Sequence, residues 1–161
     1  MTATRINHVS IKANDLEESA RFYEEIFRMV RIPTARFSEP VLWLALGGQQ
    51  LHLFQVEGND PTERHHFGID VDDFDAVYAR AKERGALDPG AWGPVLRRHP
   101  MGWVQLYLRD PAANLVEVNW PDASSLSPEV QAELEPLERI VPQDGEAATA
   151  TLYHGSEMID S

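Results

Sequence analysis

Apolar and polar residues alternate along residues 5–12 and again along residues 65–71, and a helical spacing of apolar residues follows each stretch. Alternation with a period of two is typical of a half-buried strand, whereas apolar residues three or four positions apart indicate an amphipathic helix. The first helical pattern extends to about Met29, and the second spans residues 74–84. Each strand and its helix are therefore predicted to open a structural unit of their own.

Three further strands are predicted after each helix. In the first unit they occupy residues 31–37, 41–46 and 50–56, and in the second unit residues 91–98, 102–109 and 114–120. Turn-forming residues separate these strands, and a polar linker at residues 57–64 separates the units. The order β-α-β-β-β thus occurs twice, which indicates an internal duplication.

The pattern predicts an α+β fold in which two paired β-α-β-β-β modules, 5–57 and 64–121, form a curved mixed sheet cup with the helices on the outside. Together they make one domain, residues 1–121. Residues 122–161 lie outside the duplication and are expected to form an acidic helix and a mobile tail. Ser127 as a cap and Pro128 at the first helical position predict the start of that helix, which is expected to run to about Arg139.

Strand alternation also predicts which polar side chains share the face that is free of helices. Three histidines and one carboxylate fall opposite the apolar positions of their strands: His8, His52, His66 and Glu117. His65 has the parity of the apolar residues of its strand and is therefore rejected in favour of its neighbour.

These four residues occupy equivalent positions in the two units. His8 and His66 lie on the first strands, and His52 and Glu117 lie on the last strands. Three imidazoles and a carboxylate suit one divalent ion such as iron, manganese, nickel, zinc or cobalt. Without His52, the remaining residues match a two-histidine, one-carboxylate triad that leaves positions open for substrate. The alternative is four unrelated polar residues on an exposed sheet face.

Aromatic and polar residues on the same face are candidates for substrate contact. Tyr107 shares a strand face with Trp103 and Gln105, and its hydroxyl is a candidate catalytic group that orients substrate or passes a proton. Trp43 and Phe54 are expected to form an apolar substrate wall. The competing interpretation is that these side chains only fill the cup or a partner interface.

Composition narrows the possible chemistry and partners. Cysteine is absent, which excludes disulfides, thiolate ligands and cysteine nucleophiles. The net charge of −12 argues against nucleic acid as a partner, although residues 121–161 contribute nine acids and one arginine to it. No apolar run is long enough for a membrane helix, and no signal-peptide core follows the amino terminus, so a cytoplasmic location is expected.

Residues 5–120 resemble the vicinal-oxygen-chelate superfamily, which includes glyoxalase I, type I extradiol dioxygenases, fosfomycin-resistance enzymes, methylmalonyl-CoA epimerases and bleomycin-resistance proteins. The resemblance rests on four stretches: Asn7-His8-Val9, Asp15-Leu16-Glu17-Glu18-Ser19-Ala20-Arg21-Phe22-Tyr23, His66-Phe67-Gly68-Ile69-Asp70-Val71, and Leu108-Arg109-Asp110-Pro111 leading to Asn114-Leu115-Val116-Glu117.

The resemblance implies a cup around one divalent metal, with family ligands falling on His8, His66 and Glu117. The family's fourth ligand, commonly Glu or Gln, falls on His52, which is a departure. A second departure is Ala113, where the family usually has glycine. Many members are homodimers, and some complete the site across the interface, so ligands of one chain need not meet within that chain.

The expected function is that of a metal-dependent enzyme that chelates two neighbouring oxygens of a small organic substrate. With His52 bound to the metal, isomerase or lyase chemistry is favoured, and the ligand carboxylate of Glu117, once released from the metal, is a second candidate catalytic group that acts as a base. Without His52 bound, the open triad and Tyr107, ten residues before Glu117 as in extradiol dioxygenases, favour catechol cleavage. The alternative is a non-catalytic small-molecule binding protein like the bleomycin-resistance members.

Overall fold

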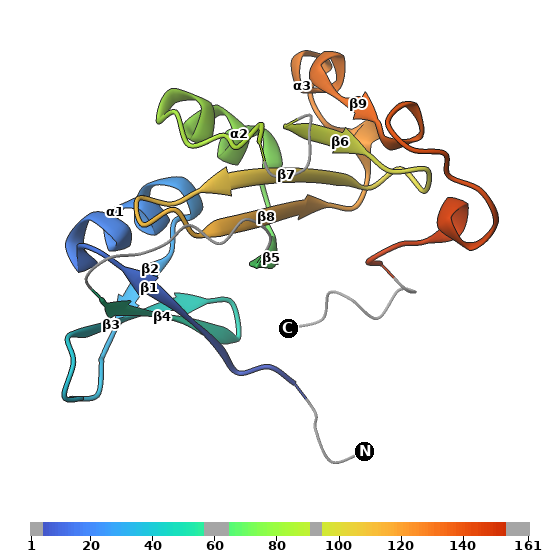
Figure 1. Cartoon of the computed structure of the whole chain (residues 1–161). Helices are drawn as coiled ribbons and strands as arrows, with labels where there is room; N and C mark the ends of the chain where they lie inside the picture. Colours follow the sequence, from blue (N-terminus) through green and yellow to red (C-terminus); the bar gives the residue numbers. More distant parts are fainter. Residues whose placement is uncertain (1–4, 57–64, 91–94, 154–161) are drawn as a thin grey trace.

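The chain folds into two units with the same order of elements, as seen in a computed structural model that describes residues 5–56, 65–90 and 95–153. The first unit consists of β1 (His8–Ala13), α1 (Leu16–Phe27), β2 (Val30–Ile32), β3 (Val41–Leu46) and β4 (Gln49–Gln55). The second consists of β5 (His66–Asp70), α2 (Phe74–Glu83), β6 (Leu96–Arg98), β7 (Val104–Arg109) and β8 (Leu115–Trp120). The predicted α+β fold of two β-α-β-β-β modules is confirmed (Figure 1).

Each unit forms its own mixed sheet. Sheet A has the strand order β1-β4-β3-β2, and sheet B has the order β5-β8-β7-β6, extended at its edge by β9 (Glu135–Pro136). In both units the first and last strands are parallel neighbours, and the other strand pairs of the unit are antiparallel. The duplication therefore extends to sheet topology, and equivalent positions of the two sheets can be compared directly.

Both long helices begin at an aspartate that caps them. The Oδ1 atom of Asp15 accepts a hydrogen bond from the backbone N–H of Glu18 at 2.9 Å, and that of Asp73 accepts one from Ala76 at 3.0 Å. Such caps satisfy backbone donors that the first helical turn leaves unpaired. The longest helix of the described chain, α1, has 12 residues. In residues 5–56, 65–90 and 95–153, no helix has the length and apolar character needed to cross a membrane.

Alternation along the strands separates an apolar face from a polar face in each sheet. On β4, Leu51 and Leu53 are fully buried in the core, and α1 packs against β3 and β4. On β8, Val116 and Val118 are fully buried in the same way. The residues at the intervening positions are consequently left on the face that the helices do not cover.

Two polar contacts, one buried and one exposed, join the units. The hydroxyl of Tyr23 on α1 donates to Oδ2 of Asp110, in the turn between β7 and β8, at 2.9 Å. From the same turn, Nδ2 of Asn114 donates to the backbone oxygen of Lys12 on β1 at 2.7 Å. Because Tyr23 is fully buried, burial is the main cause that raises its pKa, and the negative charge of Asp110 adds to it.

The second strand of each unit is shorter than predicted. β2 ends at Ile32, because Pro33 has no N–H to donate and the hydroxyl of Thr34 accepts the N–H of Trp43 at 3.0 Å. β6 begins at Leu96. Residues 91–94 of the predicted strand, and the predicted linker at 57–64, lie outside the described residues.

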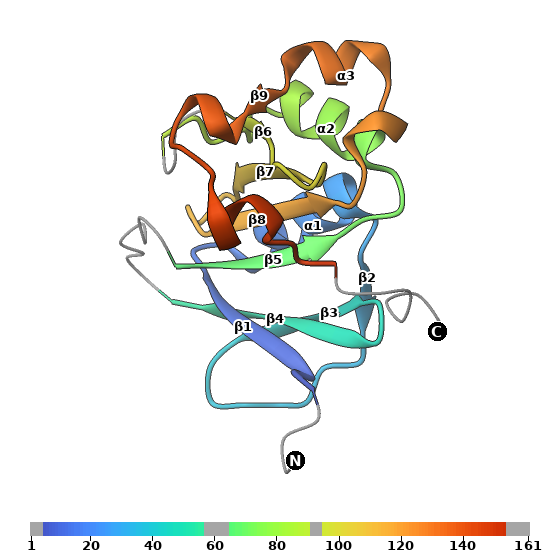
Figure 2. The same cartoon turned by 90° about the vertical axis from the view of Figure 1, so that its right-hand side faces the viewer.

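The predicted helix from Ser127 to about Arg139 is also too long. Its start is confirmed, since Ser127 caps α3 (Pro128–Glu133), but the helix ends at Glu133. Pro136 disfavours helical geometry in the residue before it, and the segment pairs with β6 as β9 instead. Beyond a short 3₁₀ helix at Gly145–Thr149, the chain passes in front of β8 and reaches the end of β5 (Figure 2).

Candidate metal and substrate site

The predicted ligands occupy equivalent positions in the two sheets. On the parallel pairs of first and last strands, Ser10 lies opposite His52, and Gly68 lies opposite Glu117. The first-strand histidine stands two residues before Ser10 in one case and two residues before Gly68 in the other. Each sheet therefore carries one histidine of the opening strand and one ligand of the closing strand in the same relative register.

The third strand adds an aromatic residue at the same register. Trp43 of β3 lies opposite His52, and Tyr107 of β7 lies opposite Glu117. Trp43 stacks on His52 with ring centroids 4.3 Å apart, whereas Tyr107 donates its hydroxyl to Glu117. The two sheets thus place different chemistry around their closing-strand ligands, with an apolar wall on sheet A and a proton donor on sheet B.

On sheet A the two histidines form a stack with the tryptophan. The rings of His8 and His52 lie 4.4 Å apart with an interplanar angle of 16°, and Trp43 covers the other face of His52. His52 is only 8% exposed as a result. Burial lowers the pKa of His52, and the neighbouring His8 lowers it further, so its neutral form is favoured.

Hydrogen bonds orient both rings. Nδ1 of His8 lies 2.6 Å from Oδ1 of Asn7, and Nε2 of His52 lies 2.8 Å from Oε1 of Gln50. A proton shared with an amide oxygen fixes which ring nitrogen keeps its lone pair. The Nε2 lone pair of His8 is left for a metal, whereas His52 must leave Gln50 before its Nε2 atom can bind one.

On sheet B, one carboxylate oxygen joins the histidine and the tyrosine. Oε2 of Glu117 lies 3.0 Å from Nε2 of His66 and accepts a hydrogen bond of 2.6 Å from the hydroxyl of Tyr107. Adjacent ligand atoms around an ion with bonds of about 2.1 Å are roughly 3.0 Å apart in octahedral geometry. The spacing and chemistry of His66 and Glu117 therefore suit coordination of one divalent ion.

The environment of Tyr107 keeps its proton in place. Burial is the main cause that raises its pKa above the ordinary value of 10.0, and the hydrogen bond to Glu117 adds to the rise. The guanidinium of Arg97, itself buried, lies 5.6 Å from the centre of the Tyr107 ring. Tyr107 is accordingly a neutral hydrogen-bond donor at physiological pH.

Sequence reasoning did not assign a site role to two polar residues beside this group, Arg97 and Asn119. Both are buried, and within the described part of the chain neither Nε of Arg97 nor Oδ1 of Asn119 has a hydrogen-bond partner. A Cβ on Gly68 would come within 3.2 Å of the side chain of Asn119, so a glycine at this position leaves space for Asn119 on the neighbouring strand β8. Asn119 lies two residues after Glu117 on β8, so strand alternation could have placed it on the same face. Arg97 lies on a strand of three residues, which is too short for alternation to show its face.

The C-terminal segment covers part of the same face. Nε1 of Trp103 donates to the backbone oxygen of Ala150 at 3.2 Å, and the hydroxyl of Tyr153 donates to Oδ1 of Asp70 at 2.6 Å. Burial raises the pKa of Tyr153, and its bond to Asp70 and the nearby Glu117 add to this. No strand or helix periodicity marks residues 150–153, so this contact could not be read from the sequence.

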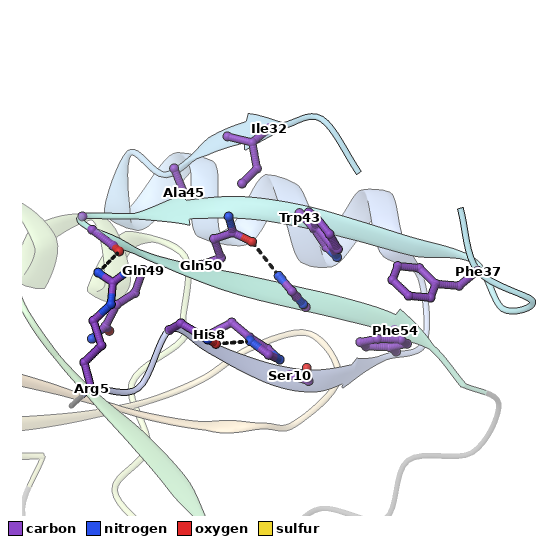
Figure 3. A pocket seen from close by; sticks show the side chains of 14 residues that line it. Arg5, His8, Ser10, Ile32, Phe37, Trp43, Ala45, Gln49, Gln50 and Phe54 are labelled. Carbon is purple, nitrogen blue, oxygen red and sulfur yellow. Dashed lines mark hydrogen bonds between the residues drawn. The ribbon is translucent and has the colours of Figure 1, made fainter. Parts of the chain in front are cut away.

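The predicted substrate residues divide between two environments. Trp43 and Phe54 line a cavity of about 790 Å³ on sheet A, together with His8 and His52 (Figure 3). On sheet B, Trp103 stacks against His99 at 3.4 Å and lies under the C-terminal segment, and Gln105 lies within 3.4 Å of His99. A role for these four residues in substrate binding stays a prediction.

The structure thus brings the four predicted ligands together as two pairs, one on each sheet. His8 contacts His52, and His66 contacts Glu117. Among residues 5–56, 65–90 and 95–153 of one chain, no three histidine, aspartate or glutamate side chains form a group that could hold a metal ion. Coordination by three or four of these residues stays a prediction.

Comparison with known proteins identifies the family to which this fold belongs. The family profile described as Glyoxalase/Bleomycin resistance protein/Dioxygenase superfamily matches residues 5–118. Similar solved structures include the oxidase ChaP-H2, with 27% identity, a TM-score of 0.60, and coverage of 74% of this chain and 94% of the other. The lactoylglutathione lyase of Agrobacterium tumefaciens has 25% identity, a TM-score of 0.55, and coverage of 74% and 95%.

The fosfomycin resistance protein FosX of Listeria monocytogenes has the same fold, with 18% identity, a TM-score of 0.58, and coverage of 81% of this chain and 99% of the other. The resemblance inferred from the sequence motifs is confirmed by the profile match. Because that match covers most of the chain, from β1 into β8, the protein belongs to the Glyoxalase/Bleomycin resistance protein/Dioxygenase superfamily.

Proposed function

We propose that the protein is a divalent-metal-dependent enzyme acting on a small organic substrate that offers two neighbouring oxygens. The observation that carries the proposal is the equivalent register of two ligand pairs, His8 with His52 on sheet A and His66 with Glu117 on sheet B. Unrelated polar residues on an exposed face have no reason to repeat both the ligand chemistry and the register.

The donor set consists of imidazole nitrogens and a carboxylate, which suit iron, manganese, nickel, zinc or cobalt. When bound, such an ion supplies Lewis-acid stabilisation for an enolate or alkoxide that develops on the substrate. His8, His66 and Glu117 are the residues whose side chains are best oriented to bind a metal ion. His52 lies stacked between two rings with its Nε2 atom on Gln50, which favours the three-residue set.

The chain's own residues supply proton chemistry beside this set. Tyr107 holds a proton at its hydroxyl, 2.6 Å from Oε2 of Glu117, and its raised pKa keeps the proton there until a stronger base approaches. A substrate oxygen that becomes anionic near Glu117 is such a base. Tyr107 has a single hydroxyl proton, so it would turn this proton from Glu117 to that oxygen and there orient or protonate the substrate.

We further propose that a second copy of the chain completes the site. One chain presents its ligands as two separate pairs, and each pair has too few ligands to hold an ion firmly. In a symmetric dimer, the sheet A pair of one copy can face the sheet B pair of the other, which gives two identical sites. The proposal explains why both pairs are present in one chain.

The proposal is tested by elemental analysis of the purified protein. We expect about one divalent ion per chain in the unaltered protein and loss of that ion in His66→Ala. The matched control is His65→Ala, which removes an exposed imidazole one position away. Retention of the metal by His66→Ala, or its equal loss from both variants, would contradict the site assignment.

Identification of the metal then separates the reaction classes. Iron would favour the oxidase or dioxygenase type of reaction, because an open triad leaves room for oxygen as well as substrate. Nickel, zinc or cobalt would favour isomerase or lyase chemistry, in which Tyr107 and Glu117 handle a proton. Assays with a catechol and with a hemithioacetal of methylglyoxal distinguish these outcomes.

A non-catalytic binding protein is the second candidate, and the cavity on sheet A favours it. The cavity measures about 790 Å³ and is lined by stacked aromatic rings, as sites that only sequester a compound can be. Native protein that contains no metal and takes up none would support this candidate over the enzyme.

A further inference from the structure

The cavity on sheet A is lined without any acidic residue. The chain has 26 aspartates and glutamates and a net charge of −12, yet none of them is among the 14 residues that line the cavity. The ionisable lining residues are Arg5, His8 and His52. A volume of about 790 Å³ is large enough for a small organic molecule, and the lining disfavours a cationic one.

One end of the cavity carries a fixed positive charge. Figure 3 shows Arg5 beside Gln49 at this end, where Nη1 of the arginine donates to the backbone oxygen of Gly48 at 3.2 Å. A guanidinium has five N–H donors, so this bond leaves donors for another acceptor. Within the described ranges, no carboxylate forms an ion pair with Arg5, and an anion that enters the cavity meets an uncompensated cation.

The other end is aromatic. The ring of Phe37 lies 6.1 Å from that of Trp43 and 6.2 Å from that of Phe54, and Figure 3 shows the three rings grouped away from Arg5. Phe37 is 50% exposed, so water covers a large apolar surface that a ligand ring would bury. His8 and Gln50 lie between the two ends in the same view.

We propose that this cavity binds small aromatic carboxylates, with the ring against Phe37, Trp43 and Phe54 and the carboxylate near Arg5. The arrangement matches a molecule that is flat and apolar at one end and anionic at the other. A neutral aromatic compound leaves Arg5 uncompensated, and a small aliphatic acid leaves the aromatic end exposed to water. The inference names the substrate class of the proposed enzyme, and to that extent it rests on the proposed function.

The test is calorimetric titration of the metal-free full-length protein with 2-naphthoate and with 2-naphthalenemethanol. We expect 2-naphthoate to bind about five-fold more tightly, the size of effect that an exposed ion pair gives. Arg5→Gln should remove that difference and leave binding of the alcohol unchanged. Phe37→Ala should weaken both compounds by about ten-fold, since both lose the same ring contact.

Arg21→Gln is the matched control, because it removes the same charge from an exposed position on α1 that does not line the cavity. Equal affinities for the acid and the alcohol in the unaltered protein would overturn the inference, as would equal weakening of 2-naphthoate binding by Arg5→Gln and Arg21→Gln. Failure of 2-naphthoate to bind a protein that does take up metal overturns this inference alone. Binding of 2-naphthoate by a protein that takes up no metal overturns the proposed function alone.

Discussion

Parity along a strand was the signal that separated ligand candidates from their neighbours. His65 and His66 differ by one position, and only His66 falls on the face that carries Glu117, where the two side chains meet at 3.0 Å. The shared face of His66 and Glu117 was predictable because one face of each sheet is buried, so a shift by one residue would move a polar side chain into the core. The contacts of His52 were less predictable, since alternation gives the face of a side chain and not its stacking partners.

The hydrogen bond between Tyr107 and Glu117 leads to a prediction about stability. Tyr107→Phe leaves a buried carboxylate oxygen without its hydroxyl donor, which should lower the free energy of unfolding by about 1–2 kcal/mol. Tyr153→Phe is the control, because its acceptor Asp70 is exposed and can bond to water instead. Urea denaturation of metal-free protein measures both. Equal losses of stability would show that burial of Glu117 does not set the cost.

Ala113 yields a second prediction at this scale. Its φ of 63° lies in the left-handed region, which costs a residue with a Cβ about 1 kcal/mol relative to glycine. We therefore expect Ala113→Gly to raise the midpoint of chemical denaturation, with a net gain of about 0.5 kcal/mol after the greater flexibility of the unfolded chain is counted. The neighbouring Ala112 has no positive φ, so Ala112→Gly should be destabilising. A fall in stability for Ala113→Gly would contradict the strain argument.

At the level of elements, long periodic segments were predictable and short ones were not. The helices α1 and α2 and the strands β3, β4, β7 and β8 follow the sequence pattern closely. β9 has two residues, too few for any period, and forms because β6 offers it an open edge. The end of α3 depends on Pro136, whose effect on the preceding residue outweighs the weak helical pattern that continues beyond it.

The C-terminal segment gives a prediction about an element that the family profile does not cover. A variant that ends at Gln143 loses the acceptor at Ala150 for the indole of Trp103, and it also loses Tyr153. Trp103 should then be more exposed to water, which shifts tryptophan emission to longer wavelength. The same truncation in a Trp103→Phe background is the control and should show a much smaller shift. Unchanged emission in the first variant would mean that the segment does not cover this face in solution.

For the whole molecule, the four tyrosines shape the response of stability to alkaline pH. The pKa is raised for each of Tyr23, Tyr78, Tyr107 and Tyr153, and burial is the main cause every time. A group whose pKa is higher in the folded than in the unfolded state stabilises the fold below the unfolded value and loses that effect as pH rises through the folded value. The free energy of unfolding should therefore fall above about pH 10.

This prediction is checked by following tyrosinate absorbance and circular dichroism together in an alkaline titration. Ionisation of the tyrosines should begin above pH 10 and accompany loss of the folded signal, because a charge on a buried hydroxyl destabilises the fold. Titration of all four tyrosines near pH 10.0, the ordinary value, with the fold intact would contradict the environments described for them.

The pairing of half-sites between copies is the feature of the whole molecule on which the proposed function depends, and mixing two defective variants tests it most directly. His8→Ala disables the sheet A pair, and His66→Ala disables the sheet B pair, so neither variant alone should retain metal. In a mixed dimer, one site combines both defects and the other combines two intact pairs. After unfolding and refolding of an equal mixture, we predict recovery of about one ion per four chains by elemental analysis. A mixture as free of metal as the separate variants, beside unaltered protein that binds one ion per chain, would contradict a site built from two copies.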